Sequence, residues 1–178
     1  MSFVIKISGL TDSGKTTVSK KLLFILKQND INVIHFDGDI LRNIFNQNDK
    51  KSYSKKDRIN LGKQYANLCC FMNQQNINVI ISTIGLYDEI GDYSRSIIKN
   101  YYEIFLDVPL NILQKRDTKS IYKNFSDGKL KNVYGLDLHY DKPANADLIL
   151  DNYSVTPDDN AKAIFAFLEN RLFKNAKQ

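Results

Sequence analysis

Eight residues near the N-terminus, GLTDSGKT at positions 9–16, match the pattern G-x-x-x-x-G-K-[ST]. An apolar run at residues 3–8 precedes them, and an amphipathic stretch at residues 15–29 follows. A strand that enters a helix through such a turn aims backbone N–H groups and the helix dipole at phosphate oxygens. This segment therefore predicts a phosphate-binding P-loop in an α/β protein.

The rest of the chain alternates short apolar runs with longer amphipathic ones. Further strands are predicted at residues 31–36, 78–82, 101–107 and 147–150, and helices at 39–45, 54–75 and 87–99, and from Pro109 and Pro157 onward. Ser54 is the expected N-cap of the long helix, with Asp57 at its N3 position. Several strands are apolar throughout, which indicates a parallel sheet covered on both faces. The 178 residues fit a single domain, residues 1–178.

The loop residues are assigned to ATP and its metal ion. Lys15 is predicted to reach the β- and γ-phosphates, and Thr16 to offer its hydroxyl to Mg²⁺. Asp12 is an anion inside an anion-binding loop, and two readings are open: it points outward, or it helps to place Mg²⁺. The predicted ATP contacts in this region are Gly9, Thr11, Asp12, Ser13, Gly14, Lys15, Thr16 and Thr17.

Two carboxylates follow the second predicted strand, at Asp37 and Asp39. The carboxyl ends of strands in an open α/β sheet line the ligand crevice, so both should lie near the P-loop. Phosphoryl transfer needs one group to orient the acceptor hydroxyl and another to help hold Mg²⁺. The alternative interpretation is structural, with Asp39 as a helix N-cap and Asp37 shaping a turn. Arg42, three residues on, suits a bidentate contact with an acceptor phosphate.

Residues 117–140 are polar, basic and irregular, and such a long connection is often a functional lid. The lid interpretation expects its lysines to close over phosphates, and Lys119 is the favoured candidate. The alternative is a solvated loop with ordinary surface charge. The other lysines, for which both readings are open, are Lys123, Lys129 and Lys131.

Composition excludes several classes of protein. No apolar run is long enough for a membrane span, and the N-terminus lacks the features of a signal peptide, so a cytoplasmic location is expected. Cys69 and Cys70 are adjacent, which favours packing in a helix over a disulfide. The net charge of +5 is scattered along the chain, which suits a phosphorylated small molecule better than nucleic acid.

These residues together resemble the adenylylsulfate (APS) kinase family, over residues 9 to about 151. The segments that carry the resemblance are GLTDSGKTT, FDGDILR, YSKKDR, FLDVPLNILQKRD, KSIYK and NVYGLDLHYDKPANADLIL. The resemblance implies a five-stranded parallel sheet, a mobile lid, a homodimer, and ATP- and Mg²⁺-dependent phosphorylation of a nucleotide's ribose 3′-hydroxyl. It implies that Asp39 faces the acceptor hydroxyl, with Asp37 near Mg²⁺ and Lys15 as the third catalytic residue.

The resemblance also assigns the remaining site residues. Arg42 and Arg58 would hold acceptor phosphates, and Arg116 would lie by the ATP base. Tyr53 stands where the family has a phenylalanine stacked on the acceptor base. Lys119 would reach phosphate when the lid closes.

The acceptor side departs from the family pattern. Leu61 replaces an asparagine that contacts the acceptor, and residues 84–88 (IGLYD) replace an I-S-P-F-R-like run. Val133, with Tyr134 beside it, replaces a second stacking phenylalanine. A pocket that loses its paired polar groups loses affinity for the original ligand.

These departures favour a different acceptor. A relative of the family phosphorylates cytidine diphosphoramidate in capsule modification, and this is the preferred acceptor, with adenylylsulfate as the alternative. Two functions of other classes have less support. One is a non-catalytic nucleotide switch, but the sequence lacks the N-K-x-D motif of GTPases. The other is a kinase that acts on nucleic-acid ends.

Overall fold

The protein is built on one five-stranded parallel sheet. The computed structural model describes residues 2–45 and 54–174, and the strands lie in the order β2-β3-β1-β4-β5. All four neighbouring pairs are parallel, as the apolar strands predicted. The strands are β1 (Val4–Ser8), β2 (Val33–Asp37), β3 (Asn78–Ser82), β4 (Tyr101–Asp107) and β5 (Leu148–Asp151).

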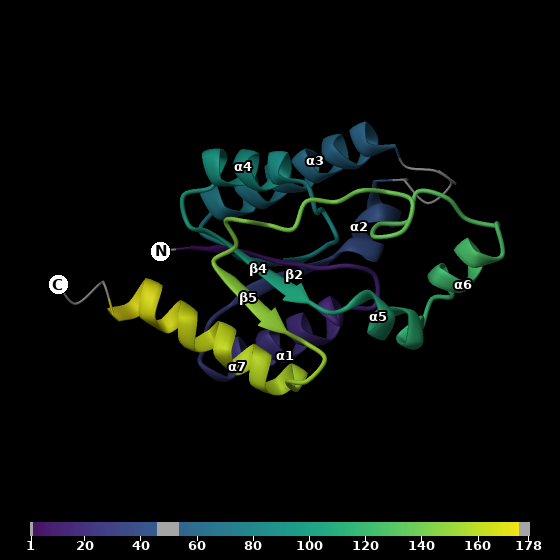
Figure 1. The fold of residues 1–178 in the computed structure, drawn as a ribbon. Helices are drawn as coiled ribbons and strands as arrows, with labels where there is room; N and C mark the ends of the chain where they lie inside the picture. The colour runs from purple at the N-terminus through teal and green to yellow at the C-terminus, as the bar shows by residue number, and fades with distance from the viewer. Residues whose placement is uncertain (1, 46–53, 175–178) are drawn as a thin grey trace.

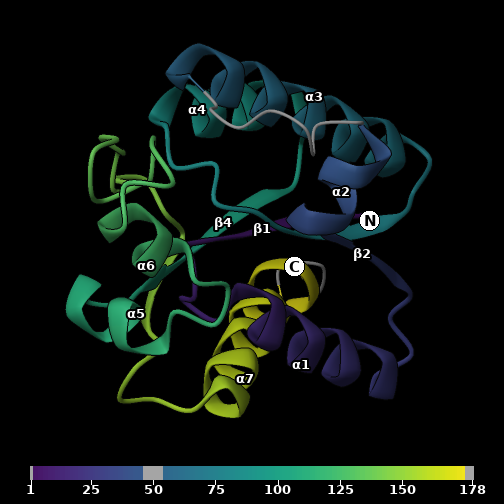
Figure 2. The same ribbon diagram turned by 90° about the vertical axis from the view of Figure 1, so that its right-hand side faces the viewer.

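Helices cover both faces of this sheet (Figure 1). The helices are α1 (Lys15–Gln28), α2 (Gly38–Ile44), α3 (Lys55–Gln74), α4 (Asp88–Ile97), α5 (Leu110–Arg116), α6 (Ile121–Ser126) and α7 (Pro157–Leu168), which continues as a π-helix over Glu169–Lys174. Figure 2 shows α1 and α7 together on one face, and α3 and α4 on the other. None of the helices in this part of the chain is long and apolar enough to cross a membrane.

The central strand β1 serves both cores, because its successive side chains point to opposite faces. Ile5 and Ile7 are buried with Leu22 of α1 and Ile164 of α7. Val4 belongs instead to a core with residues of α3, including Tyr65 and Cys69. All five residues of β1 are buried, so the P-loop that follows it begins from a fixed point.

A buried ion pair lies in the middle of the sheet. Nζ of Lys6 on β1 lies 2.8 Å from Oε1 of Glu103 on β4, and both side chains are almost fully buried. Lys6 also donates to the carbonyl of Gly85, in the loop after β3, at 2.8 Å. The pair therefore ties the two central strands to the wall of the cleft described below.

Helix starts follow the signals in the sequence. Ser54 and Asp57 form the predicted capping box of α3, with Oγ of Ser54 accepting from the Asp57 N–H at 3.2 Å. Pro157 opens α7 as predicted, behind the N-cap Thr156. The prediction for Pro109 was wrong by one position, since this residue is the N-cap of α5 and lies outside its first turn.

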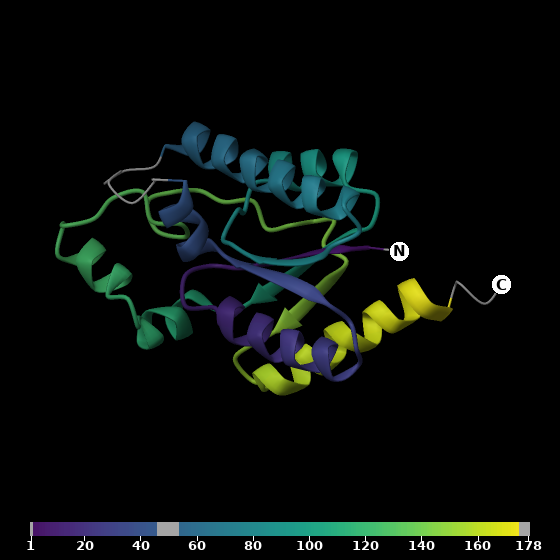
Figure 3. The same cartoon turned by 180° about the vertical axis from the view of Figure 1, so that it is seen from behind.

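Residues 117–140 are less irregular than predicted, because they contain the short helix α6. The Asp117 carboxylate starts α6 by accepting from the backbone N–H groups of Tyr122 at 3.1 Å and Lys123 at 2.9 Å. Figure 3 shows α6 standing clear of the sheet, beyond the ends of the strands. The polar loop predicted at residues 46–53 lies outside the described residues.

Candidate active site

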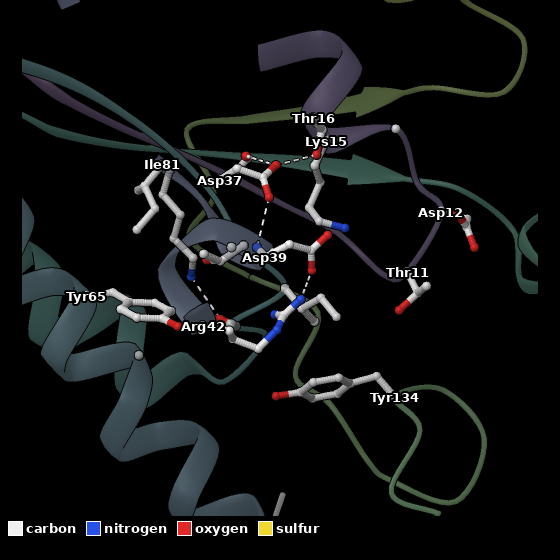
Figure 4. A pocket seen from close by; sticks show the side chains of 18 of the residues that line it. Thr11, Asp12, Lys15, Thr16, Asp37, Asp39, Arg42, Tyr65, Ile81 and Tyr134 are labelled. Carbon is white, nitrogen blue, oxygen red and sulfur yellow. Dashed lines mark hydrogen bonds and ion pairs between the residues drawn. The ribbon is translucent and has the colours of Figure 1, made fainter. Parts of the chain in front are cut away.

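A cleft of about 1030 Å³ lies at the carboxyl ends of the strands. Its walls come from the P-loop, the ends of β2 and β3, helices α2 and α3, segment 117–140 and the residues after β5. Figure 4 shows the side chains that meet there. The predicted site residues that line it are Thr11, Asp12, Gly14, Lys15, Thr16, Thr17, Asp37, Asp39, Arg42, Arg58, Arg116, Lys119, Val133 and Tyr134.

Two of the predicted residues that the structure describes, Gly9 and Ser13, are absent from that wall. Both are buried, and an added Cβ at Gly9 would lie 2.9 Å from the Leu106 carbonyl oxygen. Ser13 is fully buried. These two residues are thus buried parts of the loop itself. Tyr53 lies outside the described residues.

Gly14 joins the loop to α1 and needs the glycine conformation. Its φ is +91°, a left-handed value that residues with a Cβ rarely adopt. A Cβ there would also collide with the Asn152 side chain. Lys15 begins α1 directly after it, so the first N–H groups of the helix point into the cleft.

The Lys15 side chain folds back over its own loop. Its ammonium donates to the Leu10 carbonyl at 2.7 Å. Burial, together with the nearby cations Lys119 and Arg42, lowers the pKa of Lys15 from its ordinary value to about 7, against the opposing effects of Asp12 and Asp37. The nearby carboxylates therefore do not stabilise the ammonium fully, and a bound polyphosphate would add the negative charge that it lacks.

Asp37 connects the P-loop to β2 and α2. Its Oδ2 accepts from the Thr16 hydroxyl at 2.6 Å and from Ser82 at 3.4 Å, and its Oδ1 accepts from the backbone N–H of Asp39 at 2.9 Å. Asp37, and not Asp39, is thus the N-cap of α2, which corrects the structural alternative for this pair.

The Thr16–Asp37 pair suits Mg²⁺ in the type of its donors. A hydroxyl and a carboxylate are hard oxygen ligands, and Mg²⁺ commonly takes one or two protein ligands and completes its shell with phosphate oxygens and water. Within residues 2–45 and 54–174, no group of three or more His, Cys, Asp or Glu side chains could hold a metal. A metal at this pair would depend on the nucleotide for its other ligands.

The Asp39 carboxylate projects into the cleft between two cations. It forms ion pairs with Arg42, one turn along α2, and with Lys119 of segment 117–140. Asp39 and Lys119 are both about half exposed. The arrangement places a solvent-accessible carboxylate opposite the P-loop, with two cations available to an anionic ligand.

Arg58, which is predicted to hold an acceptor phosphate, lies in the cleft beside residues 132–134. The Arg58 guanidinium lies 4.3 Å from the ring centroid of Tyr134 and donates to the Asn132 carbonyl at 2.7 Å. Val133 and Tyr134 are buried, and the Tyr134 ring packs on Tyr87 at 5.6 Å. Arg58 is therefore engaged with segment 117–140 in this structure.

Sequence reasoning missed Asn152, which fixes the back of the P-loop. Its buried amide donates to the Ser13 carbonyl at 2.7 Å and accepts from Asn160 at 2.8 Å. Arg116 donates to the Asn152 carbonyl at 2.8 Å, on the side of the cleft lined by residues 153–157. A partial signal was available, because Asn152 directly follows the carboxyl end of a strand, but nothing in the sequence pairs it with Ser13.

For Asp12, the structure adds a contact that neither of the two open readings included. Its carboxylate accepts a hydrogen bond from the Thr118 hydroxyl, at the start of segment 117–140. Figure 4 shows Lys15 between Asp12 and Asp37, so the two carboxylates lie on opposite sides of the lysine.

Comparisons with known proteins identify the family of the chain. The sequence model of a family described as adenylylsulphate kinase matches residues 1–151. A cytidine diphosphoramidate kinase of Campylobacter jejuni is 38% identical over 150 residues, which cover 84% of this chain and 86% of the relative. An adenylyl-sulfate kinase of Pseudomonas aeruginosa is 31% identical over 168 residues, covering 93% and 85%. The Mycobacterium tuberculosis APS kinase, solved with AMPPNP and APS, superposes with a TM-score of 0.86 at 25% identity, covering 94% of this chain and 98% of that one.

Proposed function

Because the chain belongs to the adenylylsulphate kinase family, we propose that it transfers the γ-phosphoryl group of ATP to the ribose 3′-hydroxyl of a nucleotide, with cytidine diphosphoramidate as the preferred acceptor. The observation that carries the reaction is the position of Asp39, a half-exposed carboxylate opposite the P-loop in one cleft. At the coarser level, the chain is a nucleotide kinase that phosphorylates a hydroxyl.

The P-loop and Lys15 hold the triphosphate in this mechanism. Backbone N–H groups at the start of α1 bind the phosphate oxygens, and the Lys15 ammonium reaches the β- and γ-phosphates. Thr16 and Asp37 would hold Mg²⁺, which neutralises phosphate charge when bound. Asn152 keeps the loop in shape through the Ser13 carbonyl.

Asp39 orients the acceptor and takes its proton. The 3′-oxygen forms a bond to the γ-phosphorus, the bond to the bridging oxygen of ADP breaks, and the hydroxyl proton passes to the Asp39 carboxylate. Arg42 and Lys119, which pair with Asp39 in the free protein, are placed to shift to the anionic groups of the two substrates.

The choice of acceptor rests on two observations. One is the 38% identity to a protein named for cytidine diphosphoramidate. The other is the remodelled wall, where Leu61 and Val133 line the cleft in place of the family's asparagine and phenylalanine. Adenylylsulfate remains the second candidate, favoured by the 31% identity to an adenylyl-sulfate kinase over 93% of the chain.

A substrate panel tests this proposal. ADP release from Mg-ATP is measured with cytidine diphosphoramidate, with adenylylsulfate and without acceptor, using Asp39→Asn as the inactive control. We expect kcat/KM for the cytidine compound to exceed that for adenylylsulfate by about tenfold or more, the scale of losing one buried hydrogen-bonding partner. Preference for adenylylsulfate would reject the proposed acceptor while keeping the kinase. ATP hydrolysis that neither compound stimulates would reject the kinase reaction and favour the nucleotide switch.

A further inference from the structure

The P-loop is tied to the start of segment 117–140 by hydrogen bonds that converge on its outer turn. The Thr118 hydroxyl donates to Oδ1 of Asp12. Arg116 donates to the Asp12 carbonyl at 3.2 Å, and the Tyr122 hydroxyl donates to the Thr11 carbonyl at 3.2 Å. Two consecutive loop residues thus receive three donors from residues 116–122.

Asp12 is an unfavourable residue for this position on three physical grounds. Its φ of +60° is a left-handed value, which strains a residue with a Cβ. Its negative charge lies in a loop that binds phosphate, and Coulomb repulsion opposes the ligand. Its Oδ2 is buried with no hydrogen-bond partner in the part of the chain that the structure describes. Glycine would remove all three penalties, and the contact with Thr118 is what glycine could not make.

The contact with Thr118 has a consequence at the opposite side of the cleft. The next residue, Lys119, forms the ion pair with the Asp39 carboxylate. The hydrogen bond to Thr118 therefore fixes the position of Lys119, which lies between the P-loop and the Asp39 carboxylate. The neighbouring Ser120 has a φ of +54°, so the chain turns sharply just after these two contacts.

We propose that Asp12 is a positioning residue that fastens segment 117–140 to the P-loop and so places Lys119 over the reacting groups. Its charge weakens ATP binding, and its hydrogen bond to Thr118 raises the rate of phosphoryl transfer. The effect on rate rests on the proposed kinase function. The effects on ATP affinity and on the order of the segment do not.

Three substitutions separate the hydrogen bond from the charge. Asp12→Gly removes both and suits the left-handed φ. Asp12→Asn removes the charge but keeps an oxygen that accepts from Thr118. Thr118→Val removes the donor and keeps the charge. Asp127→Asn is the matched control, because Asp127 is in the same segment but pairs with Lys129 at 2.9 Å, outside the cleft.

We expect Asp12→Gly and Thr118→Val to lower kcat by about tenfold, the scale of a hydrogen bond to a charged group. Asp12→Asn should keep kcat within about threefold of the wild type. At about pH 6 or below, where Lys15 is charged, both substitutions of Asp12 should lower the Kd for ATP by a few fold, since repulsion of the phosphates is lost. Thr118→Val should not lower it. The double variant Asp12→Gly/Thr118→Val should be about as slow as either single variant, since both remove the same bond.

Hydrogen exchange provides a readout without any acceptor. Amides of residues 118–124 should exchange about tenfold faster in Asp12→Gly and Thr118→Val than in the wild type, and unchanged in Asp127→Asn. If the contact with Thr118 had no role, Asp12→Gly would be at least as stable and as active as the wild type, because glycine removes the three penalties at this position. Wild-type kcat and exchange in Asp12→Gly would overturn the proposal. If no acceptor is phosphorylated, the kinase proposal fails and the exchange and ATP affinity decide on Asp12. Unchanged exchange together with unchanged ATP affinity would overturn the Asp12 proposal, whereas the expected shifts would support it.

Discussion

Raising the pH above neutrality should weaken the binding of ATP to the free protein through the titration of Lys15. Burial, with Lys119 and Arg42 nearby, lowers the pKa of this lysine to about 7. Above that pH the free protein holds a neutral amine that cannot attract phosphate. The bound triphosphate favours the ammonium, so ATP binding must then take up one proton.

The size of the effect follows from that pKa. Each pH unit above about 7 lowers the charged fraction of Lys15 about tenfold, which is about 1.4 kcal/mol of binding free energy per unit. Affinity should therefore fall about tenfold between about pH 8 and about pH 9. Below about pH 7 the slope should flatten, because Lys15 is then already charged and the terminal phosphate of the nucleotide, with a pKa near 6, begins to protonate.

Calorimetry with a non-hydrolysable Mg-ATP analogue measures both quantities. Titrations in two buffers of different ionisation enthalpy should give an uptake of about one proton per nucleotide at about pH 8.5. Lys15→Gln is the control, because it carries no titratable group and should bind weakly with no such slope. If the affinity of the wild type stays constant from about pH 7.5 to about pH 9 and no proton is taken up, the reasoning is refuted. Lys15 would then not change its charge when ATP binds.

Two further substitutions test other parts of the molecule. Asp39→Asn should lower kcat by about 10²–10⁴-fold, the range for loss of a general base, while the Kd for ATP by calorimetry stays within about twofold; full turnover would reject Asp39 as the base. Glu103→Gln should lower the free energy of unfolding by about 3–5 kcal/mol in denaturant titrations, because it leaves the Lys6 charge buried without its partner. The double variant Lys6→Met/Glu103→Gln should recover much of that loss, and no recovery would argue against the ion pair as the cause.

Much of the fold could be predicted because its signals are local. The apolar runs gave β3 and β4 with the bounds that the structure has, residues 78–82 and 101–107. The capping box of Ser54 and Asp57 marked the start of α3, because both of its hydrogen bonds lie within three residues. The P-loop likewise depends on eight consecutive residues and the two elements that flank them.

The missed features depend on pairs of residues far apart in the sequence. Thr118 and Asp12 are separated by 106 positions, and Asn152 and Ser13 by 139. No periodicity or motif links such partners, and each bond exists only because the strands bring their ends to one edge of the sheet. The buried partner of Lys6 was hidden for the same reason, since Glu103 is 97 positions away in the sequence.

The position of Arg58 could not be read from its chemistry. A guanidinium suits phosphate and an aromatic ring equally well. In this structure the Arg58 guanidinium lies over the ring of Tyr134. Tyr134 belongs to a turn in which Asn132 has a φ of +59° and Asp137 accepts a hydrogen bond from the Val133 N–H at 2.6 Å. The shape of that turn, and not the identity of Arg58, decides which of the two contacts forms.

The position of the new phosphate ester is the most direct test of Asp39 and the P-loop as parts of one transfer site. Wild-type protein is incubated with Mg-ATP and cytidine diphosphoramidate, and the products are followed by ³¹P NMR. We expect ADP and a 3′-phosphorylated nucleotide to appear in equal amounts. ADP accompanied by inorganic phosphate alone, or by an ester at any other position, would contradict the proposed transfer to the 3′-hydroxyl.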